Sequence, residues 1–255
     1  MGRNLAALGI AQDRASLRSA FIRAKKLVKR YTAQLRKIAR HVDDIARGFN
    51  PASAAGQATM QAAMLRYGEA IRPWAEAEAD RVVTEVAQSD ARSWRKLSAE
   101  IGRAVHREIE TAPTGTVMHR LMQDQVELIT SLPREAAERV HRIATEGLAK
   151  GMRAPELAAE ILRTGEVTRS RADLIARTEV GRAATALTQA RAVHVGSTHF
   201  IWRTSRDGDV RESHRKLDGL TFRWDDPPEC DPGHRNLPGC IWNCRCYAEP
   251  LINLE

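Results

Sequence analysis

The chain has 255 residues, 43% of them apolar, and a formal net charge of +8 at pH 7. No stretch reaches 18 apolar residues and the N-terminus lacks the apolar segment of a signal peptide, which excludes a membrane-spanning helix. The positive charge favours an acidic partner, either a nucleic acid or an acidic protein surface. We therefore expect a mainly helical protein, rich in Ala, Leu, Arg and Glu, that is made and kept in a cytoplasm.

Apolar residues near the N-terminus recur at alternating spacings of four and three. They are Leu17, Phe21, Ala24, Val28, Tyr31, Leu35, Ile38, Val42, Ile45 and Phe49. This heptad pattern predicts one long helix that packs along a partner helix. Asn50 and Pro51 follow the pattern, and they are residue types that end one helix and begin another.

A second, shorter heptad pattern follows the first. Its positions are Met60, Met64, Tyr67, Ile71 and Trp74. Because the connection from Asn50 to Ala55 is short, the two patterns predict an antiparallel helical hairpin, formed within one chain or through self-association of two chains. Pro73 removes a backbone hydrogen bond and is expected to kink or split the second helix.

The first predicted helix also carries a run of basic residues with no acidic residue among them. They are Arg14, Arg18, Arg23, Lys25, Lys26, Lys29, Arg30, Arg36, Lys37 and Arg40. This basic strip is either a solvated helix face or a surface for an acidic partner, since like charges on one helix repel each other. If the partner is nucleic acid, binding is expected to be independent of sequence, because no recognition or stacking pattern accompanies the strip.

Two segments with turn-forming residues, Thr111–Thr116 and Ser131–Pro133, interrupt the helical pattern. We place the domain boundary at the second. This predicts an elongated helical region over residues 1–132 and a C-terminal domain over residues 133–255.

The C-terminal domain is expected to begin with helices. We predict one from Pro133 to Lys150, a short one from Pro155 to Leu162, and a long one capped by Thr168 or Ser170.

The period of the pattern changes after the last predicted helix. His199–Thr204 is a β-rich run bounded by an Asp-Gly turn signal, and Leu217–Trp224 indicates a second turn and strand. The predicted fold class is therefore mainly α with a small C-terminal α+β domain. It starts with a long N-terminal helical hairpin and ends with helices capped by a short antiparallel sheet that carries a cysteine cluster.

All the cysteines, Cys230, Cys240, Cys244 and Cys246, lie near the C-terminus. In a strand, Cys244 and Cys246 would share one face of the sheet. The four residues are candidates for a structural zinc site, with His214 and His234 as alternative ligands. One or two disulfides, or free thiols, are the other interpretations.

Arg211, His214 and Asp218 form a second group, because helical spacing would bring them to one side of a helix. A histidine beside an aspartate and an arginine could act as a general base. A hydrogen-bonded trio with a structural role is the commoner arrangement. Asp218 and Gly219 also form a typical turn sequence.

The C-terminal motifs form an ordered series. It consists of Ile175-Ala176-Arg177-Thr178-Glu179 on a helix, then Trp202, Arg211-Glu212-Ser213-His214, Leu217-Asp218-Gly219, a Pro-rich loop and Asn243-Cys244-Arg245-Cys246. The series resembles the phage Mu F-like family of minor head, or head morphogenesis, proteins. This resemblance covers residues 133–250, and residues 1–132 carry no motif of the family.

The resemblance implies a tailed-phage protein that joins the procapsid in the host cytoplasm and remains in the virion. Its implied partners are the portal, scaffold or major capsid protein, together with packaged DNA. The positions that match the family motifs are Arg177, Thr178, Glu179, Trp202, Arg211, His214, Asp218, Gly219, Cys244, Arg245 and Cys246. Since none of these is assigned a catalytic role, the leading hypothesis is a structural protein without enzymatic activity.

Two alternatives belong to other classes. One is a metal-dependent nuclease or hydrolase centred on His214 and the cysteines, although a zinc ion with four protein ligands leaves no open position for water. The zinc deaminase signature is also absent. The other alternative is a sequence-independent DNA-binding protein that uses the basic strip.

Overall fold

The computed structural model describes residues 14–101 and 111–252, apart from the side chains of residues 14–24, 97–101 and 148. The chain forms two compact units. Unit 1 contains Met1–Val28, Arg81–Leu121 and Arg177–Glu255, and unit 2 contains Lys29–Asp80 and Met122–Ala176. Each unit combines segments that are distant in sequence, so the predicted division at residues 132 and 133 stays a prediction about domain organisation.

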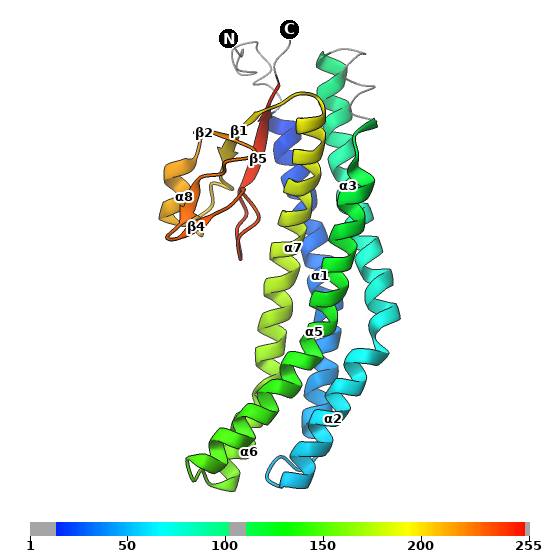
Figure 1. Ribbon diagram of the computed structural model, residues 1–255, viewed down its shortest axis with the longest axis vertical. Coiled ribbons are helices and arrows are strands. Elements are labelled where there is room, and N and C mark those ends of the chain that lie inside the picture. The colour runs from blue at the N-terminus through cyan, green and yellow to red at the C-terminus, as the bar shows by residue number, and fades with distance from the viewer. Residues whose placement is uncertain (1–13, 102–110, 253–255) are drawn as a thin grey trace. The chain divides into compact units, whose positions relative to one another are not determined.

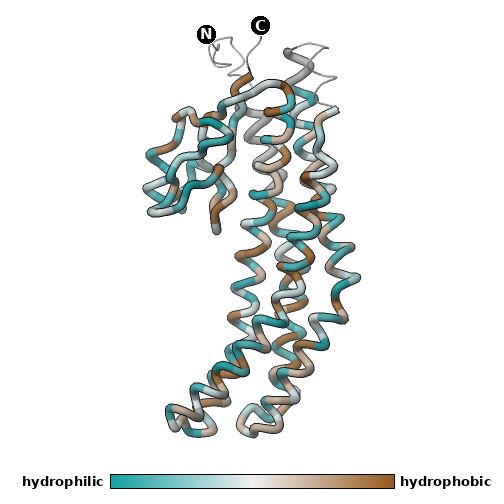
Figure 2. The backbone as a smooth tube through the Cα atoms, in the orientation of Figure 1, coloured by the Kyte–Doolittle hydropathy of each residue, from teal (hydrophilic) through white to brown (hydrophobic). Residues whose placement is uncertain are grey.

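Helices make up most of the described chain, and short strands follow them near the C-terminus (Figure 1). The helices are α1 (Arg14–Arg47), α2 (Ala54–Ala70), α3 (Arg72–Ile101), α5 (Thr114–Ala149), α6 (Ala154–Leu162), α7 (Thr164–His194) and α8 (Glu212–Leu217). Apolar and polar residues are interspersed along them, as amphipathic helices require (Figure 2). The predicted fold class is confirmed.

The heptad pattern of the first helix corresponds to a buried stripe on α1. Tyr31, Leu35, Ile38 and Val42 are each at most 1% exposed. Since these positions recur every three or four residues, they lie on one face of the helix. The pattern positions Leu17, Phe21 and Ala24 lie outside the side chains that the structure describes.

The predicted hairpin forms within one chain. Ser53 caps α2 by accepting a hydrogen bond from the backbone N–H of Gly56 at 3.0 Å. The ring of His41 on α1 lies 4.2 Å from the ring of Tyr67 on α2, measured between centroids. Helices α1 and α2 therefore contact each other within the chain. As expected, the helix divides near Pro73, since α2 ends at Ala70 and α3 begins at Arg72.

Two predicted helix ends are wrong. Pro133 does not begin a helix, because α5 runs through it. The hydroxyls of Thr130 and Ser131 donate to the carbonyls of Val126 and Leu128, at 2.9 and 3.0 Å, and so bond to backbone acceptors in the turn preceding the proline.

The start of the long helix also differs from the prediction. Neither Thr168 nor Ser170 is a cap, because α7 begins at Thr164. The hydroxyl of Thr168 instead donates to the carbonyl of Thr164 within the first turn, at 2.8 Å. A threonine in this position satisfies a backbone acceptor of its own helix, which a sequence pattern does not distinguish from capping.

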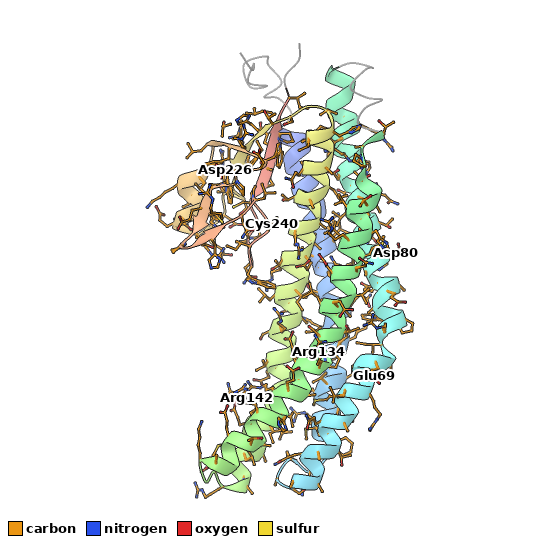
Figure 3. The ribbon with its side chains drawn as sticks, viewed as in Figure 1. Glu69, Asp80, Arg134, Arg142, Asp226 and Cys240 are labelled. Carbon is orange, nitrogen blue, oxygen red and sulfur yellow. The ribbon has the colours of Figure 1, made fainter. Side chains whose placement is uncertain are left out.

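Unit 2 is held by a buried apolar core and by ion pairs between helices. Leu35, Ile129, Leu132, Ile161 and Ile175 are almost completely buried. Charged side chains such as Glu69, Arg134 and Arg142 lie on the outside of its helices (Figure 3). This arrangement is the usual one for amphipathic helices that share a core.

Unit 1 contains the small sheet. The order of its strands is β2 (Thr221–Arg223), β1 (His199–Arg203) and β5 (Tyr247–Leu251), all antiparallel to their neighbours. A separate hairpin pairs β3 (Glu229–Asp231) with β4 (His234–Arg235). The predicted strands within His199–Thr204 and Leu217–Trp224 are confirmed, whereas β5 and the hairpin are additional.

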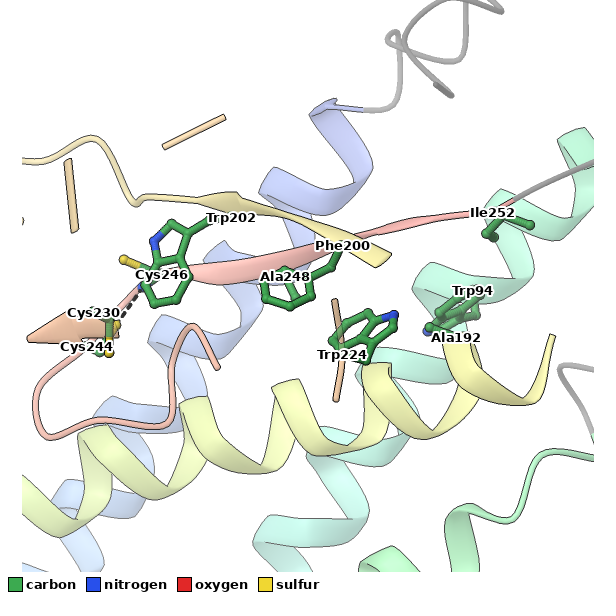
Figure 4. Close-up of a cluster of buried hydrophobic side chains, with 10 residues drawn as sticks. All are labelled: Trp94, Ala192, Phe200, Trp202, Trp224, Cys230, Cys244, Cys246, Ala248 and Ile252. Atoms are coloured by element: carbon green, nitrogen blue, oxygen red, sulfur yellow. Dashed lines mark hydrogen bonds between the residues drawn. The ribbon is translucent and has the colours of Figure 1, made fainter. Parts of the chain in front are cut away.

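A cluster of buried side chains joins the sheet to α3 and α7 in unit 1. It contains Trp94, Ala192, Phe200, Trp202, Trp224, Cys230, Cys244, Cys246, Ala248 and Ile252. Figure 4 shows Trp94 and Trp224 at one end of this cluster and the three cysteines beside Trp202 at the other. The cysteines therefore belong to the core of the C-terminal domain.

Candidate functional site

The candidate site is formed where α8 meets the loop that precedes β5. His214 lies in α8, which begins after Arg211, and it is 2% exposed. Its Nδ1 atom lies 3.5 Å from the sulfur of Cys244 and 3.5 Å from the sulfur of Cys246. These three side chains could together hold a metal ion, because their ligand atoms all lie within 4.8 Å of one another. Among the described residues, they form the group of metal-binding side chains that meets this distance.

Cys244 and Cys246 reach this position without being in a strand. They precede β5, which begins at Tyr247. Asn243 has a φ of +59°, a left-handed conformation that asparagine tolerates better than most residues. The prediction of a strand at these cysteines is therefore wrong, but both sulfurs lie near the same histidine nitrogen.

The sulfur of Cys244 accepts several hydrogen bonds. The backbone N–H groups of Gly239 and Cys246 each donate to it at 3.4 Å. A hydrogen bond from the Cys246 thiol, followed by one from His214, lowers the pKa of Cys244 to about 4. The pKa of Cys246 is raised, because its proton is held in the hydrogen bond to Cys244. Of the two sulfurs, that of Cys244 therefore has the surroundings that better stabilise negative charge.

The remaining predicted ligands lie outside this group. Cys230 is buried, and its thiol donates to the carbonyl of His234 at 3.5 Å. Burial raises the pKa of Cys230, and burial raises that of Cys240 to about 12. The side chain of His234 is exposed on β4. No disulfide joins any of the four cysteines, all of which lie among the described residues.

Asp231 is the carboxylate that faces His214. Its Oδ2 atom lies 3.6 Å from His214 Nε2 and 3.3 Å from Arg211 Nη1. Its Oδ1 atom accepts a hydrogen bond from the hydroxyl of Ser213 at 2.8 Å. The predicted grouping of Arg211 and His214 with Asp218 is therefore wrong, because β3 supplies the acid.

Asp218 and Gly219 form the predicted turn. A carboxylate oxygen of Asp218 accepts the backbone N–H of Thr204 at 2.9 Å. Gly219 has a φ of +87°, and its N–H donates to the carbonyl of Trp202 at 2.8 Å. A residue with a Cβ atom would be strained there. These two residues hold α8 against β1.

Trp202 packs directly on the site. Its ring lies 5.4 Å from the ring of His214 in an edge-to-face arrangement, and its side chain is fully buried. The indole therefore fixes the plane of the imidazole and shields the histidine from water.

Helix α7 supports the loop that carries the cysteines. The hydroxyl of Thr178 accepts the backbone N–H of Asn243 at 3.3 Å, and the hydroxyl of Thr185 donates to the carbonyl of Pro238 at 2.6 Å. Gly181 lies between these threonines and faces Gly239. Three residues on one face of α7 thus hold the two ends of the cysteine loop.

The other motif residues also have structural positions. Arg177 is exposed, whereas the buried Glu179 lies 3.7 Å from the guanidinium of Arg182. Arg245 points away from the cysteines and pairs with Asp207 at 2.8 Å and Asp209 at 3.1 Å. Arg245 therefore fastens the loop before α8 to the cysteine loop.

The basic strip is only partly an open surface. Arg36 makes two hydrogen bonds to the carboxylate of Asp173, at 2.7 and 2.6 Å, which raise its pKa. Lys25, Lys26, Lys29, Arg30, Lys37 and Arg40 are exposed. The side chains of Arg14, Arg18 and Arg23 lie outside those that the structure describes.

The burial of His214 bears on the enzyme alternative. At 2% exposure, and with its ring in contact with that of Trp202, His214 presents little surface to solvent. The arrangement is suited to linking α8, β3 and the cysteine loop, or to binding an ion.

The fold and this site define a helical protein with a C-terminal α+β domain built on a buried Cys-Cys-His group. Residues 138–249 match the family model described as Phage Mu protein F like protein. The resemblance expected from the motifs is therefore confirmed over these residues.

Two relatives also match. The chain is 32% identical over 168 residues to an uncharacterized protein of Haemophilus influenzae, a match that covers 66% of this chain and 37% of the relative. It is 34% identical over 110 residues to an uncharacterized protein of Methanocaldococcus jannaschii, covering 43% of this chain and 16% of the relative. No solved structure matches significantly. Among the helices of the described residues, none has the length and hydropathy needed to span a bilayer.

Proposed function

We propose that this protein is a minor head protein of a tailed phage, with a structural role in head morphogenesis. The observation that supports this proposal is the match of residues 138–249 to the Phage Mu protein F like family. The structure is compatible with such a role, because the motif residues of this domain contact one another and the backbone.

The expected partners are proteins of the procapsid, namely the portal protein and the scaffold or major capsid protein. The expected location is the assembling head in the host cytoplasm and later the inside of the virion. Both follow from the family and would make the protein a component of the head, associated with the portal or inner shell.

Co-assembly tests this function. The full chain is produced together with the portal, scaffold and major capsid proteins of the same phage, and procapsids are separated by sedimentation. We expect the chain to sediment with procapsids and to stay free when the portal protein is omitted. A chain that stays at the top of the gradient in the complete mixture would contradict the proposal.

A second candidate function is sequence-independent contact with packaged DNA. It is favoured by the exposed basic residues of α1, among them Lys29, Lys37 and Arg40, which lie on the face opposite the buried stripe. Such contact would add to a role in assembly and would not replace it.

A further inference from the structure

We propose that His214, Cys244 and Cys246 bind one zinc ion, which acts as a structural link in the C-terminal domain. The proposal is independent of the proposed function, since it concerns the folding of the domain and holds whether or not the protein enters a phage head.

The spacing of the ligand atoms fits zinc. Zinc binds imidazole nitrogen at about 2.0–2.1 Å and thiolate sulfur at about 2.3 Å, so two ligands at tetrahedral angles lie roughly 3.6 Å apart. The distances from His214 Nδ1 to the sulfurs of Cys244 and Cys246 are both 3.5 Å. Both nitrogen–sulfur distances therefore match those around a shared zinc ion, and all three ligand atoms lie within 4.8 Å of one another.

The chemistry of the group also favours zinc over the harder cations. Two thiolates and one imidazole are soft or borderline ligands, whereas magnesium and calcium select oxygen. The carboxylate nearby, Asp231, faces the other side of the imidazole, 3.6 Å from Nε2. This placement is that of a group outside the coordination sphere, and it favours the proton on Nε2, which leaves Nδ1 for the metal.

The surroundings of Cys244 resemble those of a metal-bound thiolate. The backbone N–H groups of Gly239 and Cys246 point at its sulfur, each at 3.4 Å. Such donors stabilise negative charge on sulfur without adding a side chain. Gly239 has a φ of +84°, a conformation that glycine adopts readily. This conformation accompanies the hydrogen bond from its N–H to the sulfur of Cys244.

The second ring nitrogen of His214 shows how a zinc ion at Nδ1 would affect the rest of the ring. His214 Nε2 is enclosed and makes no hydrogen bond, and Trp202 covers the ring. Buried polar atoms are rarely left unpaired in native proteins. Zinc at Nδ1 would polarise the ring and strengthen the interaction between the Nε2 proton and Asp231.

A zinc ion here would join two separate parts of the domain. His214 belongs to α8, while the two cysteines belong to the loop that Thr178 and Thr185 hold on α7. The thiol of Cys230 lies in the same buried cluster and offers a fourth ligand if it turns from the His234 carbonyl (Figure 4). Four protein ligands would close the site, as in structural zinc sites.

The test measures metal in the purified full chain. Protein made in zinc-supplemented medium is expected to contain one zinc per chain by elemental analysis. His214→Ala and Cys246→Ser are expected to lose it. His234→Ala is the matched control, because His234 is exposed on the neighbouring hairpin, and it is expected to retain zinc. Loss from His234→Ala combined with retention by His214→Ala would overturn the assignment.

A measurement on the unaltered chain guards against variants that fail to fold. Replacing zinc with Co²⁺ is expected to give the visible bands of tetrahedral cobalt and sulfur-to-metal charge transfer, and X-ray absorption at the zinc edge should show at least two sulfurs. Zinc removal by a chelator should lower the melting temperature, and added zinc should restore it. A folded chain that binds neither metal, or that contains a Cys244–Cys246 disulfide, would refute the proposal.

Discussion

Gly181 of α7 and Gly239 of the cysteine loop are in direct backbone contact. A Cβ atom built on Gly181 would lie 3.0 Å from the carbonyl oxygen of Gly239, and one built on Gly239 would lie 3.3 Å from the carbonyl oxygen of Gly181. Both residues must therefore lack a side chain for the loop to reach the helix. This contact sets the distance between α7 and the loop that carries Cys244.

We predict that Gly181→Val destabilises the protein by about 1–3 kcal/mol, because the added atoms push the loop off the helix. Urea unfolding measures this change. Gly68→Ala is the control, since Gly68 lies inside α2 and its Cβ would meet only ordinary contacts at 3.6 Å and beyond. That change should stabilise by up to about 1 kcal/mol through helix propensity. Equal effects of the two substitutions would mean that the Gly181–Gly239 contact has no role in stability.

The hydrogen bond from Thr185 to Pro238 supports the same loop from another point. Thr185 is 4% exposed, so Thr185→Val leaves the Pro238 carbonyl buried without its 2.6 Å partner. We expect a loss of about 1–3 kcal/mol in the free energy of unfolding. Hydrogen exchange should also quicken at the amides of Gly239 and Cys246.

Thr59→Val provides the comparison for this prediction. The hydroxyl of Thr59 donates to the Ala55 carbonyl of its own helix, and the residue is exposed. Water replaces that hydrogen bond, so we expect a change within about 0.5 kcal/mol. If Thr185→Val is as mild as Thr59→Val, the loop does not depend on the threonine.

The elements that the sequence predicted are those specified by local patterns. The stripe of Tyr31, Leu35, Ile38 and Val42 follows from spacing alone, and Pro73 marks the division between α2 and α3 through its own geometry. The strand β5 was not predicted, and it contains Pro250, a residue type that is unfavourable in central strands. It is tolerated there because β5 is an edge strand that pairs only with β1.

The site was only partly predictable, because its contacts depend on tertiary structure. His214, Cys244 and Cys246 were recognisable as residues able to bind metal. Asp231 was not, since it lies in a short strand and approaches His214 only after the β3–β4 hairpin folds back toward α8. The preference for Asp218 came from helical spacing, but α8 ends before Asp218, at Leu217.

A buried ion pair in unit 1 gives a third prediction. Asp90 of α3 accepts hydrogen bonds from Arg191 and Thr188 of α7, both at 2.7 Å. The side chains of Asp90 and Arg191 are only 7% and 9% exposed. Asp90→Ala removes a buried carboxylate that pairs with this guanidinium, and we expect a loss of about 3–5 kcal/mol.

Thermal and urea unfolding measure the effect of Asp90→Ala. The control is Asp226→Ala, because Asp226 pairs with Arg235 where both side chains are more than half exposed. Water screens such a pair, so its loss should change the melting temperature very little. A small effect of Asp90→Ala would show that water reaches Arg191 in solution.

The last prediction concerns DNA. If α1 contacts duplex DNA through its exposed basic face, the triple variant Lys29→Gln, Lys37→Gln, Arg40→Gln should bind more weakly and with a smaller salt dependence. The slope of log affinity against log salt should decrease by about 0.9 for each phosphate that the variant no longer neutralises.

A triple variant of exposed arginines elsewhere in unit 2, Arg66→Gln, Arg134→Gln, Arg169→Gln, removes the same charge. Because it leaves α1 unchanged, it should keep the slope of the unaltered chain. Equal decreases in both variants would indicate attraction by net charge alone, and no binding at about 50 mM salt would leave the basic face of α1 to protein partners.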